Sequence, residues 1–403
     1  MRWKGKGCAL LLAAVWLTTS AATIDVAVIS IVPKEGLSWT FLHWLGAMVA
    51  KTEGLVGSVT DVLTTEVTAL SDLATLAESR RYGLIVVVGW QLRPAVEAVA
   101  AEFPDQNFMM TDVKLTAPLP NVFNVLYQQE QPSAVVGALA AALAVHYGMP
   151  HVGLVLGREG AVLHEFEMGY KFGVDWALNK IGRDYPDLLA AAPIAQKPRQ
   201  ERVLWTYTGS FVDPALGRAA TEAQVLAGAG VVYNVAGATG LGIFSYVDDH
   251  HRERGIPAGL PPFAIGVDLV QEWMSPHIII SALKRADLAV RQAIELIVKG
   301  EFRDYVAAHP FVWYNFANGG MGVTDLATFE LFLDYMLYLG KISTDDRANL
   351  IAHWHYMRNA QPEWVWNVMQ EMIDAIMREE VEIPRPFGEP EKWRIEELRK
   401  IYG

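Results

Sequence analysis

Several ingredients of common protein classes are scarce in this 403-residue chain. A single cysteine excludes a disulfide within the chain and any cysteine cluster that could bind zinc. Positive charge is outnumbered, with 33 Lys and Arg against 45 Asp and Glu, so the acidic chain repels nucleic-acid phosphates and we expect no nucleic-acid partner. Charged residues make up only 19% and apolar residues 52%, which excludes disorder and predicts a large core in two or more lobes.

Residues 1–22 are the only stretch that could enter a membrane. They begin with three basic residues and no acid, continue with ten apolar residues (8–17), and end with small ones. The apolar run is too short to span a bilayer and is typical of a signal peptide, which predicts cleavage near Ala22. Cys8 stands at the start of the apolar run instead of following it, so we predict no lipobox. The sequence thus predicts export to the periplasm or the outer cell surface, with a retained membrane anchor as the alternative.

Apolar strands alternate with helices over most of the remaining chain. Strands are expected at 24–32, 84–88, 107–111, 121–126, 151–156 and 231–235, and helices at 39–51, 94–103, 134–147, 163–179 and 214–227. Short apolar strands between helices predict parallel sheets covered on both faces. No linker separates two halves, so we expect two lobes that share chain crossings. Ligands on such sheets bind beyond the carboxyl ends of the strands.

The last eighty residues predict a helical extension. Helices are expected at 325–339, 345–358, 362–380 and 392–402. Gly340 is a good stop for the first of these helices, and Ser343 with Asp346 resembles a capping box that begins the second. The aromatic residues of this extension favour packing against the body of the protein.

Motifs for catalysis and for metal binding are missing. The chain has no G-x-S-x-G, no H-E-x-x-H and no Gly-Lys-Ser/Thr loop. Asp248–His251 offers four metal ligands in succession, but consecutive residues of a helix cannot all face one ion, so we predict a solvated helix end. The glycines of 237–242 have the reverse of the dinucleotide-binding spacing. The sequence therefore predicts no enzyme, no metal and no cofactor, with a nucleoside hydrolase kept as the enzymatic alternative.

Nine short motifs follow one another along residues 24–323. They are Ser38-Trp39-Thr40, Ala101–Asp112, Asn121-Val122, Gly137–Ala144, Gly209–Asp213, Ala236–Gly242, Ile265–Asp268, Ser281–Lys284 and Gly319–Gly322. This ordered set resembles the basic membrane protein family, the substrate-binding lipoproteins of ABC transporters that include purine nucleoside receptors. Thr40 stands where the family has asparagine, Gly36-Leu37 replaces an acidic start, and the lipobox cysteine is absent.

The resemblance implies an α/β architecture, the type I periplasmic-binding-protein fold with two Rossmann-like lobes and hinge crossings. Residues 23–127 and 268–306 would form the N-terminal lobe, and residues 128–267 and 307–323 the C-terminal lobe. Residues 324–403 would be a helical extension packed on the C-terminal lobe. A ligand would bind in the cleft, which closes by hinge motion.

The resemblance also implies a site between the lobes. Trp39 and Phe211 stand where the family sandwiches a nucleobase, and Asp112 stands where a carboxylate accepts hydrogen bonds from the base edge. Asp268 and Lys284 stand at ribose-binding positions. The full expected ligand-binding set is Trp39, Thr40, Asp112, Phe211, Gly237, Asp268 and Lys284. Residue type alone leaves open core packing for the aromatics, a turn for Asp112, and a salt bridge between Asp268 and Lys284.

The function implied is that of an extracytoplasmic solute-binding protein. It would bind a nucleoside, with a purine base, and deliver it to an ABC permease in the membrane, acting as a monomer. A sensor that uses the same cleft to signal through a membrane partner is the alternative. The identity of the base is left open.

Overall fold

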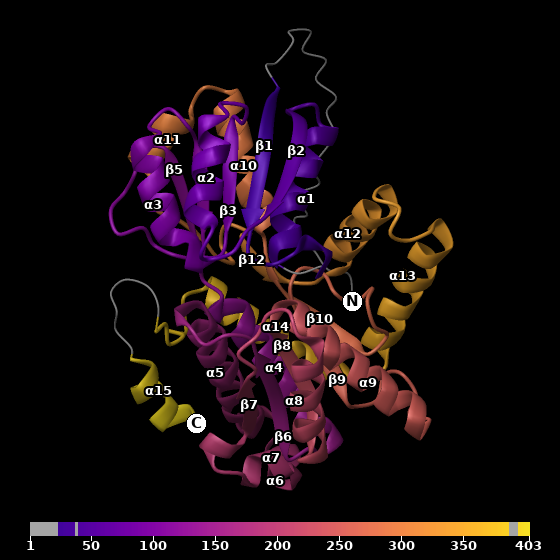
Figure 1. The fold of residues 1–403 in the computed structure, drawn as a ribbon. Coiled ribbons are helices and arrows are strands. Elements are labelled where there is room, and N and C mark those ends of the chain that lie inside the picture. The colour runs from indigo at the N-terminus through magenta and orange to yellow at the C-terminus, as the bar shows by residue number, and fades with distance from the viewer. Residues whose placement is uncertain (1–22, 37–38, 387–393) are drawn as a thin grey trace.

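The computed structural model describes residues 23–36, 39–386 and 394–403. The predicted signal peptide and Ser38 therefore lie outside the described residues. Two six-stranded sheets form the cores of two lobes, one above the other in Figure 1. Helices flank both sheets, as the alternation of strands and helices predicts.

The first sheet is entirely parallel and has the order β2-β1-β3-β4-β5-β11. Its strands are β1 (Ile24–Ser30), β2 (Val56–Leu63), β3 (Leu84–Val88), β4 (Phe108–Thr111), β5 (Val122–Tyr127) and β11 (Val312–Tyr314). Its helices are α1 (Trp39–Thr52), α2 (Ala69–Glu78), α3 (Arg93–Glu102), α10 (Ala286–Val298) and α11 (Phe302–Ala308). Val26 and Val28 face α1 and α10, whereas Ala27 and Ile29 face α2 and α3. Both faces of β1 are buried, which explains its unbroken apolar sequence.

The second sheet has the order β7-β6-β8-β9-β10-β12, and only β12 runs antiparallel. Its strands are β6 (His151–Leu156), β7 (Val203–Tyr207), β8 (Ala229–Val235), β9 (Phe263–Asp268), β10 (Ile278–Lys284) and β12 (Met321–Val323). The helices of this lobe are α4 (Glu130–Tyr147), α5 (Ala161–Asp184), α6 (Pro186–Ala191), α7 (Pro193–Gln196), α8 (Pro214–Leu226) and α9 (Leu241–Arg254). Strands β2 and β7 are not among the strands that the sequence predicts. They lie at sheet edges, where partial exposure interrupts the apolar run.

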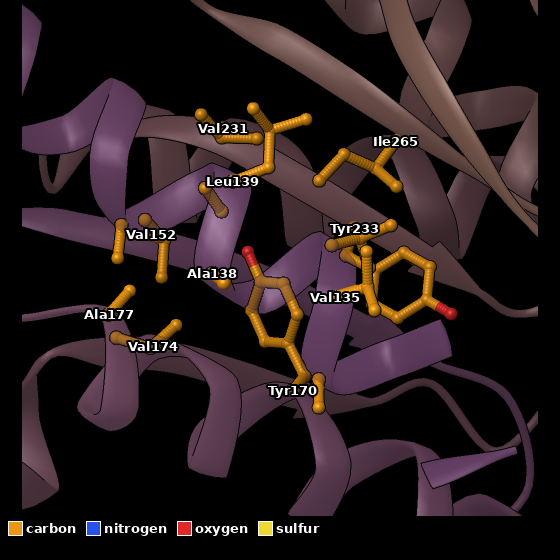
Figure 2. Close-up of a cluster of buried hydrophobic side chains, with 14 of the residues drawn as sticks. Val135, Ala138, Leu139, Val152, Tyr170, Val174, Ala177, Val231, Tyr233 and Ile265 are labelled. Carbon is orange, nitrogen blue, oxygen red and sulfur yellow. The ribbon is translucent and has the colours of Figure 1, made fainter. Parts of the chain in front are cut away.

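The core of the second lobe is built around α4, which is buried on nearly every side. Figure 2 shows its residues between the sheet and α5, where the rings of Tyr170 and Tyr233 lie 5.2 Å apart. A Cβ on Gly173 would lie 2.0 Å from the Ala134 carbonyl oxygen. Glycine at this position therefore allows the backbones of α4 and α5 to approach closely.

The chain crosses between the lobes after β5, after β10 and after β11. The predicted boundaries at 268 and 306 are wrong, because β10 pairs in the second sheet and β11 in the first. The second crossing therefore follows Lys284 and the third follows Tyr314. Strands β9 and β10 are neighbouring parallel strands that read alike in sequence, so the sequence does not show which of them precedes the crossing.

The C-terminal extension forms α12 (Leu326–Tyr338), α13 (Thr344–Asn359), α14 (Glu363–Met377) and α15 (Ile395–Tyr402). The capping box of Ser343 and Asp346 is confirmed. Helix α14 packs into the second-lobe core. Helix α12 instead packs Phe329 and Phe332 against Phe41 and neighbouring residues of α1 in the first lobe. Packing of the extension on the C-terminal lobe alone is therefore a wrong prediction, because α12 lies against the first lobe.

No helix in the described part of the chain is both long and apolar enough to cross a membrane.

Candidate functional site

A cavity lies between the lobes, where strands of both sheets end. It holds about 700 Å³ of space free of protein atoms, its opening to solvent included. Its first-lobe walls follow β1, β3 and β4 and include the start of α1, while its second-lobe walls include the start of α5 and the ends of β9 and β10. Parallel strands present their carboxyl ends to a common edge, so two facing sheets produce a cleft with loops on both sides.

All seven residues of the expected set line this one cavity: Trp39, Thr40, Asp112, Phe211, Gly237, Asp268 and Lys284. They come from six separate segments of the chain. The fold therefore brings residues that lie far apart in sequence to one space between the lobes.

Lys284 is the central charge of the cavity. Its side chain is 3% exposed and forms an ion pair with Asp112, which follows β4 in the first lobe. Its ammonium nitrogen lies 4.1 Å from the centroid of the Trp39 ring and 4.9 Å from that of Tyr127. An ammonium in such a place is stabilised by the aromatic faces and by its carboxylate partner. Lys284 ends β10 of the second lobe, so this ion pair joins the two lobes.

Asp112 and Asp268 share an unusual backbone conformation. Their φ angles are +69° and +66°, in the left-handed region that disfavours most side chains. Each residue directly follows or ends a strand, where the turn directs its carboxylate into the cavity. Strained backbone of this kind concentrates at ligand-binding positions, and aspartate tolerates it better than bulkier residues.

Burial sets the protonation of both carboxylates. It raises the pKa of Asp268 to about 7, with Lys284 opposing the shift and Asp112 adding to it. Burial also raises the pKa of Asp112, again against the effect of Lys284. The cavity therefore has two acids for one cation, and Asp268 is the acid that exchanges its proton near neutral pH.

His43 of α1 holds the first-lobe wall in place. Burial lowers its pKa to about 3, so the ring is neutral. Its Nδ1 lies 3.0 Å from the Trp39 carbonyl oxygen, which can only accept, so Nδ1 carries the proton. Its Nε2 then accepts from the Thr111 hydroxyl at 3.1 Å. This bridge ties Trp39 to the end of β4, next to Asp112.

Phe211 lies in a niche made by two glycines of the second lobe. A Cβ on Gly157 would lie 2.2 Å from the Phe211 ring, and one on Gly237 would lie 3.5 Å from the Phe211 Cβ. Gly237 also has a φ of +58°, which favours glycine. Gly157 therefore makes room for the Phe211 ring, and Gly237 lets the backbone turn beside it.

Further aromatic residues of the site were not predicted. Trp90 follows β3 in the first lobe, and Phe166 lies on α5 in the second; both line the cavity. Trp90 reaches the opposite lobe, because a Cβ on Gly160 would lie 3.3 Å from its ring. The end of the buried run 84–88 could have identified Trp90 by the strand-end rule, whereas no local signal marks Phe166.

A second ion pair joins the lobes on the surface. Arg158, which follows β6, lies 2.8 Å from Glu66, which follows β2, and both side chains are largely exposed. Exposed pairs of this kind contribute at most about 1 kcal/mol, whereas removing one partner of a buried pair such as Lys284 and Asp112 costs more because it leaves a buried charge uncompensated.

The part of the chain that the structure describes contains no group of three or more His, Cys, Asp or Glu residues placed to hold a metal ion. The prediction of a solvated helix end at Asp248–His251 is wrong for His251, which is buried. Its ring stacks on that of His277 at 3.7 Å, and its Nε2 lies 2.9 Å from the Pro262 carbonyl oxygen. Helix α9 continues to Arg254, so this turn faces the loop before β10.

Comparison with protein families and known sequences supports the predicted resemblance. Residues 25–182 match the Bmp family model, described as ABC transporter substrate-binding protein PnrA-like. An uncharacterized lipoprotein of Pyrococcus furiosus is 29% identical over 389 residues, which cover 95% of this chain and 91% of the relative. A Lactococcus lactis protein named ABC transporter nucleoside-binding protein BmpA is 26% identical over 266 residues, covering 63% and 67%.

Solved structures agree with the fold. An ABC transporter solute-binding protein from Aeropyrum pernix K1 superposes with a TM-score of 0.79 at 28% identity, over 94% of this chain and 98% of that one. One from Conexibacter woesei superposes with a TM-score of 0.57 at 19% identity, over 91% of this chain and all of that one, and shows the fold alone. The predicted resemblance to the basic membrane protein family and the two-lobed type I periplasmic-binding-protein fold are confirmed.

Proposed function

We propose that this chain, like the ABC transporter substrate-binding proteins whose family model it matches, captures a small molecule outside the cell, and that this molecule is a purine nucleoside. The observation that carries the proposal is the convergence of all seven expected residues on one interlobe cavity. The Lactococcus relative named as nucleoside-binding supports the choice of ligand.

The two aromatic residues support a nucleobase as part of the ligand. Trp39 comes from the first lobe and Phe211 from the second, and both line the cavity. A planar base that enters the open cleft would be stacked between them as the lobes close. Stacking of this kind contributes about 1–3 kcal/mol per base.

The polar residues support a ribose and a base edge. Asp112 and the Thr40 hydroxyl can hydrogen-bond the base, and Asp268 can accept from two adjacent sugar hydroxyls. Lys284 forms an ion pair with Asp112 and not with Asp268, so the open alternative of an Asp268–Lys284 salt bridge is not observed. Its other ammonium protons can reach a ligand hydroxyl. Gly237 would let the backbone approach the ligand closely.

The cellular setting is part of the same proposal. Export through the N-terminal segment would place the protein at the outer surface or in the periplasm. There, as a monomer, it would hand its ligand to an ABC permease. The Pyrococcus relative is named a lipoprotein, but the only cysteine of this chain, Cys8, does not follow the apolar run. Membrane attachment would therefore rely on retention of that run.

Mass spectrometry of the ligand released from natively purified, denatured protein tests the proposal. We expect a purine nucleoside from the wild-type protein and none from Lys284→Met purified in parallel. Release of a sugar, an amino acid or a peptide would overturn the choice of ligand. Titration calorimetry with adenosine, guanosine, inosine and their free bases would then rank the ligands.

A further inference from the structure

The chain beyond α14 returns to the boundary between the lobes. We call this place the seam; Glu130, Glu165 and Trp313 meet Arg385 there. Ile383 is buried in the second-lobe core, and Val381 packs against the same core. The segment is therefore fixed to the second lobe, and it carries Arg385 to the place where the first and third crossings pass.

Arg385 contacts residues on both sides of the seam. Its guanidinium carbon lies 4.6 Å from the centroid of the Trp313 ring, which belongs to β11 of the first lobe. Its Nε lies 3.1 Å from Glu130, the first residue of α4, and 3.6 Å from Glu165 of α5. One planar cation thus stacks on the first lobe and pairs with two carboxylates of the second.

Arg385 is a cation that opposes the effect of burial on these two acids. Their side chains are 2% and 0% exposed. Burial raises the pKa of Glu130 to about 7 and raises that of Glu165 well above its ordinary value, with Arg385 opposing both shifts. Gln129 adds one hydrogen bond of 2.6 Å to Glu165. Removal of Arg385 would leave two buried acids side by side without a cation.

The seam is linked directly to the cavity. Glu165 precedes Phe166, which lines the cavity and lies 5.6 Å from the Lys284 ammonium. Val162 and Leu163 of the same helix also line it. Whatever holds the start of α5 against the first lobe therefore determines the shape of the cavity.

We propose that Arg385 is a positioning residue that holds the first lobe against α5 in the observed arrangement of the lobes, so that the C-terminal extension sets ligand affinity without touching the ligand. Within the described residues, the cavity lining ends at Lys284. The inference relies on the proposed function only in assuming that ligand enters by movement of the lobes.

The distance between the lobes tests this inference without any ligand. Spin labels at Glu78→Cys on α2 and Glu222→Cys on α8, both exposed positions, report that distance by pulsed electron spin resonance, with Cys8→Ser as background. We expect Arg385→Gln to shift the distribution to longer distances. Arg378→Gln is the matched control, because Arg378 is 64% exposed and its two ion pairs lie within the extension.

Two further measurements keep the test decisive. Trp313→Leu removes the first-lobe contact but leaves both carboxylates paired, and we expect the same shift in distance even if Arg385→Gln does not fold. The affinity for the released ligand should fall at least tenfold in both variants and stay unchanged in Arg378→Gln. An unchanged distance distribution in Trp313→Leu would overturn the inference, whatever the ligand proves to be.

Discussion

Two buried charge clusters join the lobes, and each has two carboxylates and one cation. In the cleft cluster, Lys284 lies with Asp112 and Asp268. In the seam cluster, Arg385 pairs with Glu130 and Glu165. The cleft cation is a compact ammonium that faces a cavity, whereas the seam cation is a planar guanidinium stacked on Trp313.

The difference indicates what each cluster is built for. In the seam cluster, Nε of Arg385 lies near both carboxylates and its guanidinium carbon lies over the Trp313 ring, so protein groups of both lobes contact this cation. An ammonium that contacts one carboxylate has donors left for another partner. Within the part of the chain that the structure describes, the side chain of Asp268 in the same cavity forms no hydrogen bond or ion pair with the protein. The seam cluster therefore suits structure, and the cleft cluster suits a polar ligand.

Removal of the cleft cation should have the largest effect. Lys284→Met keeps the volume of the side chain but leaves Asp112 and Asp268 buried without their cation. Breaking a buried pair in this way costs about 3–5 kcal/mol of stability. We expect urea unfolding to show this loss of stability. We also expect titration calorimetry to detect no nucleoside binding. Lys299→Met, at a 58% exposed lysine, is the control and should change neither quantity.

Loss of the second-lobe aromatic should have an intermediate effect. Phe211→Ala removes one face of the proposed sandwich, so nucleoside affinity should fall by about 1–3 kcal/mol. Phe211 is only partly buried, so the free energy of unfolding should change little. Val212→Ala, at the neighbouring 56% exposed position, serves as the control. Wild-type affinity in Phe211→Ala would exclude Phe211 from the sandwich.

At the seam cluster, a second substitution should restore part of the stability that the first one removes. Arg385→Gln should destabilise the protein because two buried acids lose their cation, and Glu165→Gln added to it should restore about 1–2 kcal/mol by removing one of those acids. Urea unfolding of the single and double variants measures the difference. Glu159→Gln is the matched control, since Glu159 is 54% exposed and pairs with Arg399. Equal restoration by both glutamines would show that general charge, and not the seam, is responsible.

The sequence predicts the architecture well where local pattern decides it. Strands β3 and β6 begin and end at the predicted residues, because both faces of each are buried and the apolar run is unbroken. The assignment of β10 to a lobe was wrong, because that assignment depends on which strand it pairs with and not on its own residues. The contacts of helix α12 with the first lobe could not be predicted for the same reason: Phe329 and Phe332 indicate a buried face but not which residues cover it.

The residues of the candidate site could be predicted, but the contacts among them could not. The resemblance located seven lining residues, because ordered motifs carry information about distant parts of the chain. It did not predict that Lys284 pairs with Asp112 across the cleft, since that contact depends on how the lobes close. Arg385 was also missed as a contact of Glu130 and Glu165, because nothing near it in sequence indicates two acids more than two hundred residues away.

The smallest expected effect concerns Asp268, whose ionisation should change ligand affinity and protein stability in opposite directions as the pH rises. Its pKa of about 7 lies above the ordinary 3.8, so the folded protein holds this proton more tightly than the unfolded chain does.

Without ligand, the contribution of Asp268 to stability should be complete below pH 4 and be lost as pH rises through 7. Affinity should change in the opposite direction, because a carboxylate accepts two ribose hydroxyls and a carboxylic acid accepts fewer. We therefore expect ribonucleoside affinity to rise by up to about tenfold from pH 6 to 8, equivalent to about 1.4 kcal/mol, and that of the 2′-deoxy form to rise less. Asp268→Asn should remove the pH dependence and the preference together. If the slope persists in Asp268→Asn, the proton belongs to another group that faces the same cation, of which Asp112 is the nearest.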